Sequence, residues 1–168
     1  MTFVPNLEFK KLLLDVHLRD EIKYCYQCNR CSDVCPVAAA APGRYEPRTL
    51  IMASFLGLPQ LALGSPDKFM IWGCQVCDTC DEICPNHIEL TEIFTLIKNI
   101  AVQQGKAPDY YTSQAKTILQ FGKAIPMQPA IERRRQKFGI PPEPKCNVDE
   151  IKAILTETKL SKKLNMEG

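Results

Sequence analysis

Eight cysteines of this sequence fall into two runs with the same spacing. The first run is Cys25-x2-Cys28-x2-Cys31-x3-Cys35 followed by Pro36, and the second is Cys74-x2-Cys77-x2-Cys80-x3-Cys84 followed by Pro85. Equivalent cysteines are 49 residues apart, so the motif is duplicated within the chain. Four thiolates at this spacing are typical of bacterial-type [4Fe–4S] sites. Zinc sites usually take two ligands from each of two separate stretches, and nine cysteines cannot all pair in internal disulfides, so both alternatives suit the pattern less well.

The spacing also predicts how two clusters share the eight cysteines. Three cysteines separated by two residues each wrap a tight loop around one face of a cubane, and the loop amides help to hold its negative charge. The fourth cysteine lies farther along the chain, and in two-cluster ferredoxins it ligates the other cluster. The first cluster is therefore expected on Cys25, Cys28, Cys31 and Cys84. The second cluster is expected on Cys74, Cys77, Cys80 and Cys35.

The residue after the second cysteine of each run is Asn29 or Asp78. Apart from glycine, Asn and Asp are the residue types that best tolerate a positive φ, so we expect both in the left-handed conformation. The second run also carries Asp81 and Glu82. With Asp78, these negative charges predict a lower reduction potential for the second cluster.

Helical patterns surround the cysteine runs. Proline at position 47 and glycine at position 57 predict a helix over residues 47–56, and residues 58–63 form a further short turn before Gly64. After the second run, an apolar stripe of Ile93, Leu96, Ile97 and Ile100 predicts a helix over residues 90–104, with Thr91 as its cap. Ahead of the first run, Phe9, Leu12, Leu13 and Val16 also have helical spacing. Because strand patterns are scarce, the sequence predicts an all-α domain whose helices bracket two clusters.

Composition excludes several classes of protein. The 168 residues are 45% hydrophobic and carry a net charge of +2, too near neutral for a general nucleic-acid binder. No apolar run approaches the roughly 18 residues needed to span a bilayer, and the first residues lack the pattern of a secretory signal. Clustered cysteines in a chain that is not secreted indicate that the protein is in a reducing cytoplasm. No phosphate loop, dinucleotide fingerprint or activated nucleophile is present, so we expect no catalytic residue in this chain.

The chain is expected to have three parts. Residues 1–23 form an N-terminal helical segment, residues 24–105 the dicluster domain, and residues 106–168 a C-terminal extension. The extension contains six prolines and the basic stretch Arg133–Lys137, so it is too interrupted to form a core of its own. We expect it to bind along a partner protein, the alternative being a solvated tail. Cys146, in this extension, has no motif partner and is expected to be a bystander thiol.

Three stretches of the sequence resemble a known family. They are Tyr24-Cys25-Tyr26-Gln27-Cys28, Pro47-Arg48 and Ile71-Trp72-Gly73-Cys74-Gln75-Val76-Cys77-Asp78-Thr79-Cys80. These stretches are similar to those of the iron–sulfur C subunits of heterodisulfide reductase from methanogenic archaea, a family with the α-helical ferredoxin fold. The resemblance covers roughly residues 20–105.

The resemblance implies an electron relay within an oxidoreductase complex. Such a relay passes electrons from the bifurcating A subunit, which contains flavin and iron–sulfur clusters, to the B subunit, which reduces the CoM-S-S-CoB disulfide in methanogenesis. A hydrogenase or formate dehydrogenase is then an indirect partner. The alternatives are an electron-transfer subunit of another dehydrogenase or disulfide-reductase-like complex, and a free dicluster ferredoxin. The near-neutral charge disfavours the free carrier, since diffusible ferredoxins are usually strongly acidic.

Overall fold

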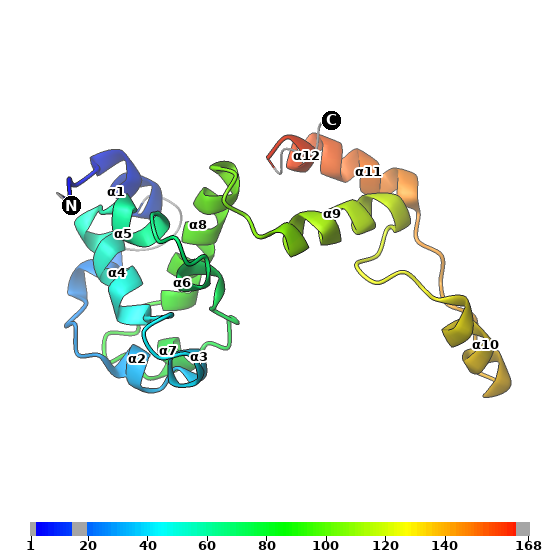
Figure 1. Cartoon of the computed structure of the whole chain (residues 1–168), viewed down its shortest axis with the longest axis horizontal. Helices are drawn as coiled ribbons and strands as arrows, with labels where there is room; N and C mark the ends of the chain where they lie inside the picture. Colours follow the sequence, from blue (N-terminus) through cyan, green and yellow to red (C-terminus); the bar gives the residue numbers. More distant parts are fainter. Residues whose placement is uncertain (1–2, 15–19, 164–168) are drawn as a thin grey trace. The chain divides into compact units, whose positions relative to one another are not determined.

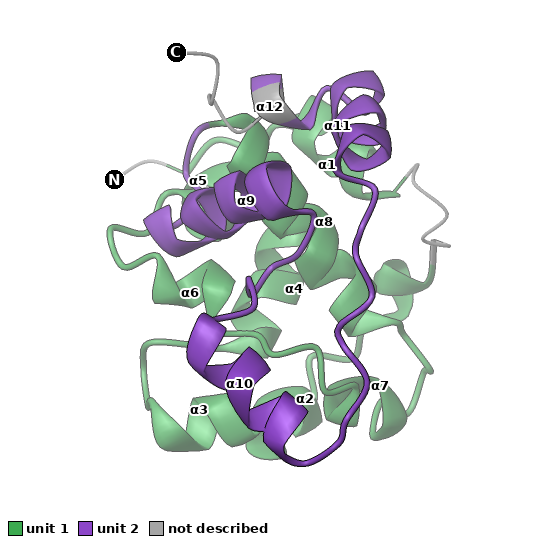
Figure 2. Ribbon diagram, turned by 90° about the vertical axis from the view of Figure 1, so that its right-hand side faces the viewer, with its two compact units in different colours: residues 1–104 green, residues 105–168 purple. Residues whose placement is uncertain are grey.

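The computed structural model describes residues 3–14 and 20–163, and every regular element in these ranges is a helix. The all-α prediction is confirmed for this part of the chain. The chain divides into two compact units, Met1–Gln104 and Gly105–Gly168 (Figure 2). Both cysteine runs belong to the first unit.

The first unit gathers three of its short helices at one end. Its elements are α1 (Leu7–Leu14), the 3-10 helix η1 (Asp20–Tyr24), α2 (Arg30–Asp33), α3 (Pro36–Ala40), α4 (Pro47–Leu56), α5 (Pro59–Leu63), α6 (Phe69–Trp72), α7 (Thr79–Glu82) and α8 (Leu90–Gln103). Helices α2, α3 and α7 gather at one end of the unit, and α1 and α5 lie at the other (Figure 1). The longer helices α4 and α8 run between these ends and pack against each other. The cysteine runs therefore meet at the end formed by α2, α3 and α7.

Helix α4 has the bounds that its proline and glycine predict. Pro47 is its first residue, where the missing amide has no intrahelical partner to lose. Gly57 ends it in the left-handed conformation at φ 68°. A Cβ at Gly57 would lie 2.8 Å from the Asn6 carbonyl oxygen, so the glycine also lets the start of α1 approach. The amide of Asn6 donates to the Gly57 carbonyl at 2.7 Å.

Helix α8 follows the prediction with two differences. It ends at Gln103, and its fully buried face contains Ile93, Phe94, Ile97 and Ala101, whereas Leu96 and Ile100 are only half-buried. Thr91 is not the N-cap, which is Glu89. The prediction was wrong because the Thr91 hydroxyl donates to the Asp81 carboxylate of the second cysteine run instead.

Helix α1 covers the far ends of α4 and α8. Phe9 and Leu13 are buried, and the Phe9 amide donates to the Asn6 side chain at 2.9 Å, which caps the helix. Leu12 is 54% exposed, so the predicted apolar stripe is narrower than expected. Val16 lies outside the described residues.

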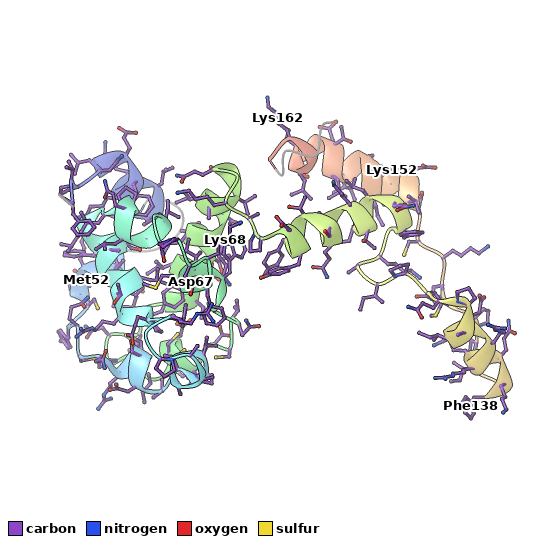
Figure 3. All side chains as sticks on the ribbon, in the orientation of Figure 1. Met52, Asp67, Lys68, Phe138, Lys152 and Lys162 are labelled. Atoms are coloured by element: carbon purple, nitrogen blue, oxygen red, sulfur yellow. The ribbon has the colours of Figure 1, made fainter. Side chains whose placement is uncertain are left out.

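A salt bridge joins two connectors on the surface of the first unit. The Arg44 side chain lies 2.7 Å from Asp67, which is labelled in Figure 3. Both side chains are largely exposed, so the pair orders the connectors more than it stabilises the fold.

The second unit contains α9 (Asp109–Phe121), α10 (Pro129–Lys137), α11 (Val148–Glu157) and α12 (Leu160–Lys163). Helices α9 and α11 pack together at Gly122, where a Cβ would lie 3.0 Å from Cys146. None of the side chains described in this unit is buried. No helix within residues 3–14 or 20–163 is long and apolar enough to cross a membrane.

Candidate iron–sulfur sites

Each half of the cysteine-rich end contains one cavity with four cysteines in its wall. The first cavity, which is partly open to solvent, is lined by the cysteines Cys25, Cys28, Cys31 and Cys84. The second is lined by the cysteines Cys74, Cys77, Cys80 and Cys35. Each cavity thus combines the first three cysteines of one run with the fourth cysteine of the other run.

The walls of the two cavities are equivalent by position. In the first cavity, the segment leading into α8 contributes Ile88 and Leu90, and the start of α4 contributes Arg48 and Ile51. In the second, the roles of the helices are exchanged: the segment leading into α4 contributes Tyr45 and Pro47, and the start of α8 contributes Thr91 and Phe94. Counted from the first residue of each helix, the four positions are the same. The motif duplication therefore extends to the helices that enclose each cavity.

Left-handed residues shape both cysteine loops. Asn29 has φ 72° and Asp78 has φ 59°, so the left-handed prediction is confirmed at both positions. Gln27 and Val76, one residue before the second cysteine of each run, are left-handed as well. Backbone of this kind turns successive amides toward one concave side, which favours a negatively charged group there.

Backbone amides also reach the cysteine sulfurs. The Val76 amide donates to Cys74 Sγ at 3.4 Å. The two fourth cysteines accept from the chain that follows them: Cys35 from the Ala38 amide at 3.5 Å and Cys84 from the Ile88 amide at 3.4 Å. Donors of this kind stabilise a thiolate and, on a cluster ligand, raise the reduction potential.

The residue after the third cysteine ties each run to a helix. The Ser32 hydroxyl accepts from the Arg48 amide at 3.3 Å, in the first turn of α4. At the equivalent position, Asp81 accepts from the Thr91 amide at 3.1 Å, in the first turn of α8. Each amide is the second of its helix and has no partner within that helix. These two contacts hold each run against the helix start that lines a cavity.

The two runs are also joined directly. The Asn86 side chain, two residues after Cys84, donates to the Tyr24 carbonyl just before Cys25. Helix α2 of the first run packs against α7 of the second. Both contacts bring the fourth cysteine of the second run to the first cavity.

Burial and hydrogen bonding act differently on the individual thiols. Burial raises the pKa of Cys31 to about 11. Burial also raises the pKa of Cys80, as does the neighbouring Asp81 carboxylate. The pKa of the exposed Cys77 is lowered, mainly by its hydrogen bond with the Thr79 hydroxyl. Without a positively charged partner, the thiols of Cys31 and Cys80 stay neutral at pH 7, and metal ions are the partners that deprotonate thiols outright.

One buried polar atom shows that the second cavity suits a sulfur-rich group. Tyr45 is 1% exposed, and its hydroxyl has no hydrogen-bond partner of normal geometry among the described residues. Tyr45 lines the second cavity with the four cysteines. A buried donor without a partner is costly, whereas thiolate and sulfide sulfurs accept hydrogen bonds. The four cysteine thiols of the second cavity, together with this hydroxyl, fit a [4Fe–4S] cluster.

Cys146 and His87 are not among the residues that line the two cysteine cavities. Cys146 lines neither cysteine cavity and packs at the α9–α11 junction. His87 is exposed, with a left-handed backbone and an amide that donates to the Cys84 carbonyl at 3.1 Å.

Sequence reasoning missed Tyr45, Ile51 and Phe94 as cavity residues. Eleven residues separate Cys35 from α4, whereas five separate Cys84 from α8. The 49-residue offset therefore aligns the cysteines but not the helices. Aligning the two helix starts would have found these positions.

Comparisons with known proteins identify a matching family model and several relatives. A family model described as a 4Fe-4S dicluster domain matches residues 17–88. The chain is 33% identical to the iron-sulfur C 2 subunit of the CoB–CoM heterodisulfide reductase of Methanocaldococcus jannaschii. That match extends over 162 residues, 93% of this chain and 84% of the Methanocaldococcus protein.

Two further relatives have related names. One is the C2 subunit of the H2/formate:CoB-CoM heterodisulfide, ferredoxin reductase of Methanococcus maripaludis, 34% identical over 71% of this chain and 61% of its own length. The other is the C subunit of the ferredoxin:CoB-CoM heterodisulfide reductase of Methanosarcina mazei, 25% identical over 83% of this chain and 86% of its own length.

The family match indicates two [4Fe–4S] clusters, and the structure provides two four-cysteine cavities. The match to the Methanocaldococcus protein extends over nearly the whole chain, including most of the second unit. This chain belongs to the family of the iron–sulfur C subunits of heterodisulfide reductases.

Proposed function

We propose that this chain is the electron-relay subunit of a heterodisulfide reductase complex, with crossed ligation of its two clusters. The first cluster would be held by Cys25, Cys28, Cys31 and Cys84, and the second by Cys74, Cys77, Cys80 and Cys35. The observation that carries the proposal is that each set of four lines one cavity. A bound [4Fe–4S] cluster supplies reversible one-electron transfer.

The chain's own residues hold the clusters and limit their contact with water. Apolar side chains from α4 and α8 close the inner walls, as Ile51 does in the first cavity and Phe94 in the second. The outer walls contain Cys28 and Cys77, which are exposed. Each site thus has one sulfur at the surface, where an electron can pass to or from a partner. Bond cleavage in the disulfide belongs to another subunit.

We propose the partners that the resemblance to heterodisulfide reductase C subunits implies. Electrons would come from the bifurcating A subunit, which contains flavin, and pass to the B subunit, which reduces the CoM-S-S-CoB disulfide. The names of the relatives include H2, formate and ferredoxin, in agreement with a hydrogenase or formate dehydrogenase as the indirect partner. We place the complex in the cytoplasm because free thiols persist in a reducing compartment.

The proposed domain organisation assigns cluster binding to residues 24–105 and partner binding to residues 106–168. Helices and connectors in the C-terminal part keep large apolar side chains in water, with Ile125 82% exposed and Phe138 73% exposed (Figure 3). We propose that a partner chain covers these side chains.

Paired cysteine substitutions test the crossed ligation. Cys84→Ser should alter the same cluster spectrum as Cys25→Ser, and Cys35→Ser the same spectrum as Cys74→Ser, in electron paramagnetic resonance of the reduced protein. Cys146→Ser is the matched control and should retain both spectra and all the iron. If Cys84→Ser altered the same spectrum as Cys74→Ser, the crossed assignment would be wrong.

The relay itself is tested in the assembled complex. Cys77→Ala should abolish electron flow from the flavin to the disulfide, because the second site is interrupted. Disulfide reduction by reduced viologen acting directly on the B subunit should persist. Loss of both activities to the same extent would assign this chain a role in the disulfide chemistry and contradict the proposal.

A further inference from the structure

The Tyr45 hydroxyl is a buried hydrogen-bond donor that has no role in the proposed relay as described above. We propose that it donates a hydrogen bond to the Cys74 sulfur of the second cluster and raises the reduction potential of that cluster. The inference rests on the proposed ligand assignment. It makes the two clusters inequivalent although their cysteine runs have the same spacing.

The Tyr45 side chain is fixed in place. Its ring packs edge-to-face on Phe94, with 6.3 Å between the ring centroids and 77° between the ring planes. Gly73 leaves room for it, since a Cβ there would lie 3.1 Å from Tyr45 Cδ2. At 1% exposure the hydroxyl has no route to water. Tyr45 therefore stays in the wall of the second cavity with the four cysteines, and Gly73 beside its ring directly precedes Cys74.

The chemistry of the hydroxyl suits a permanent donor. A tyrosine hydroxyl is protonated at neutral pH, so it has one hydrogen to give. A hydrogen bond to a buried thiolate is charge-assisted. It stabilises the reduced cluster more than the oxidised cluster, because the reduced cluster carries one more negative charge.

The first cavity has no buried hydroxyl at the equivalent position, and its side-chain donor is the half-buried Gln27, whose amide donates to Cys25 Sγ at 3.3 Å. The equivalent position, two residues before the first residue of the enclosing helix, is Ile88, which is 2% exposed and has only an alkyl side chain. The Tyr45 hydroxyl therefore acts on the second of the two proposed clusters and not on the first.

The Tyr45 hydroxyl and the acidic residues of the second run shift the reduction potential of the second cluster in opposite directions. Asp78 and Glu82 are exposed, so solvent and salt screen their charges. The Asp81 carboxylate is engaged by the Thr91 amide and hydroxyl. Tyr45 acts inside the cavity, where screening is weak.

Tyr45→Phe removes the donor and keeps the ring. In the anaerobically purified full chain, a redox titration followed by electron paramagnetic resonance should show one midpoint potential lowered and the other unchanged. The lowered potential should belong to the cluster that Cys77→Ser alters, not to the one that Cys28→Ser alters. Tyr24→Phe, at a 66% exposed tyrosine, is the matched control and should change neither potential.

The outcomes separate this inference from the ligand assignment. If the unsubstituted chain bound fewer than two clusters, the ligand assignment would fail. If Tyr45→Phe kept both clusters with both potentials unchanged, the Tyr45 inference would be overturned. If Tyr45→Phe lost its second cluster, 3-fluorotyrosine at position 45 decides, since it keeps the hydroxyl and makes it a stronger donor. A raised potential of the second cluster supports the inference, and an unchanged one overturns it.

Discussion

Each of the two cysteine loops contains two residues in the left-handed conformation. The left-handed conformation of Asn29 and Asp78 follows from residue type, because their short polar side chains tolerate a positive φ. The same conformation at Gln27 and Val76 does not follow from residue type. Valine is β-branched and strongly disfavours it, so the cluster loop imposes this backbone on whatever residue is there.

Val76→Gly should therefore stabilise the loaded protein. Glycine adopts the left-handed conformation without the steric cost that valine bears, roughly 1 kcal/mol or more. We expect a higher midpoint of thermal unfolding under anaerobic conditions. The neighbouring Gln75, which is exposed and is not among the left-handed residues, is the matched control. Gln75→Gly should lower the midpoint or leave it unchanged. A lower midpoint for Val76→Gly would show that no strain is present there.

Cluster uptake should strengthen as the pH rises. Burial raises the pKa of the Cys31 thiol from 9.0 to about 11, so below that pH the thiol is protonated in the cluster-free chain. Binding iron must release this proton, and the apparent affinity therefore rises with pH. Iron transfer from a competing chelator between about pH 7 and about pH 9.5 measures this dependence. The control Cys146→Ser should show the same dependence. An affinity that did not change with pH would contradict the raised pKa.

Helix ends link the cysteine runs to the cavity walls. The contacts of Ser32 with α4 and of Asp81 with α8 are equivalent, and each satisfies a backbone amide in the first helical turn. Because α4 and α8 line both cavities, these caps determine where the enclosing side chains lie.

Asp81→Ala should lower the free energy of unfolding by about 1–2 kcal/mol, as expected for the loss of a helix cap. The comparison is Glu82→Ala, an exposed acidic residue of the same helix, which should change it by less than about 0.5 kcal/mol. Anaerobic denaturant unfolding of the loaded protein gives both values. Equal effects of the two substitutions would mean that the Asp81 contact to α8 is not a stabilising cap.

Helices with clear end residues were predictable from the sequence, and packing details were not. Pro47 and Gly57 determine α4 by their backbone geometry, which requires no tertiary information. The exposure of Leu12 and the half-burial of Leu96 depend on which neighbours cover each helix face. Tyr45 could not be identified as a cavity residue from the cysteine spacing, because the connector between the fourth cysteine and the next helix differs in length between the two halves of the domain.

The two units of the molecule differ in how they are stabilised. Every buried hydrophobic side chain among the described residues lies between Phe9 and Ala101. The second unit has exposed amphipathic helices instead. At the scale of the whole molecule, we therefore assign electron transfer to the first unit and assembly to the second.

A chain ending at Gln104 should keep both clusters but fail to assemble. The first unit contains all eight motif cysteines and its own core, so iron content and spectra should match the full chain. Co-purification with the partner proteins should fall by a factor of about ten or more, since a loss of about 1.4 kcal/mol in binding already has that effect. Assembly at full yield without residues 105–168 would remove the proposed partner-binding role of the second unit.

The decisive experiment for the relay is anaerobic purification of the native chain, with identification of every protein that accompanies it. We expect two proteins in constant ratio with this chain, one containing flavin and the other rich in cysteine, and two [4Fe–4S] clusters on this chain. A chain that purified alone with both clusters would be a diffusible carrier, and that result would contradict the relay within a heterodisulfide reductase complex.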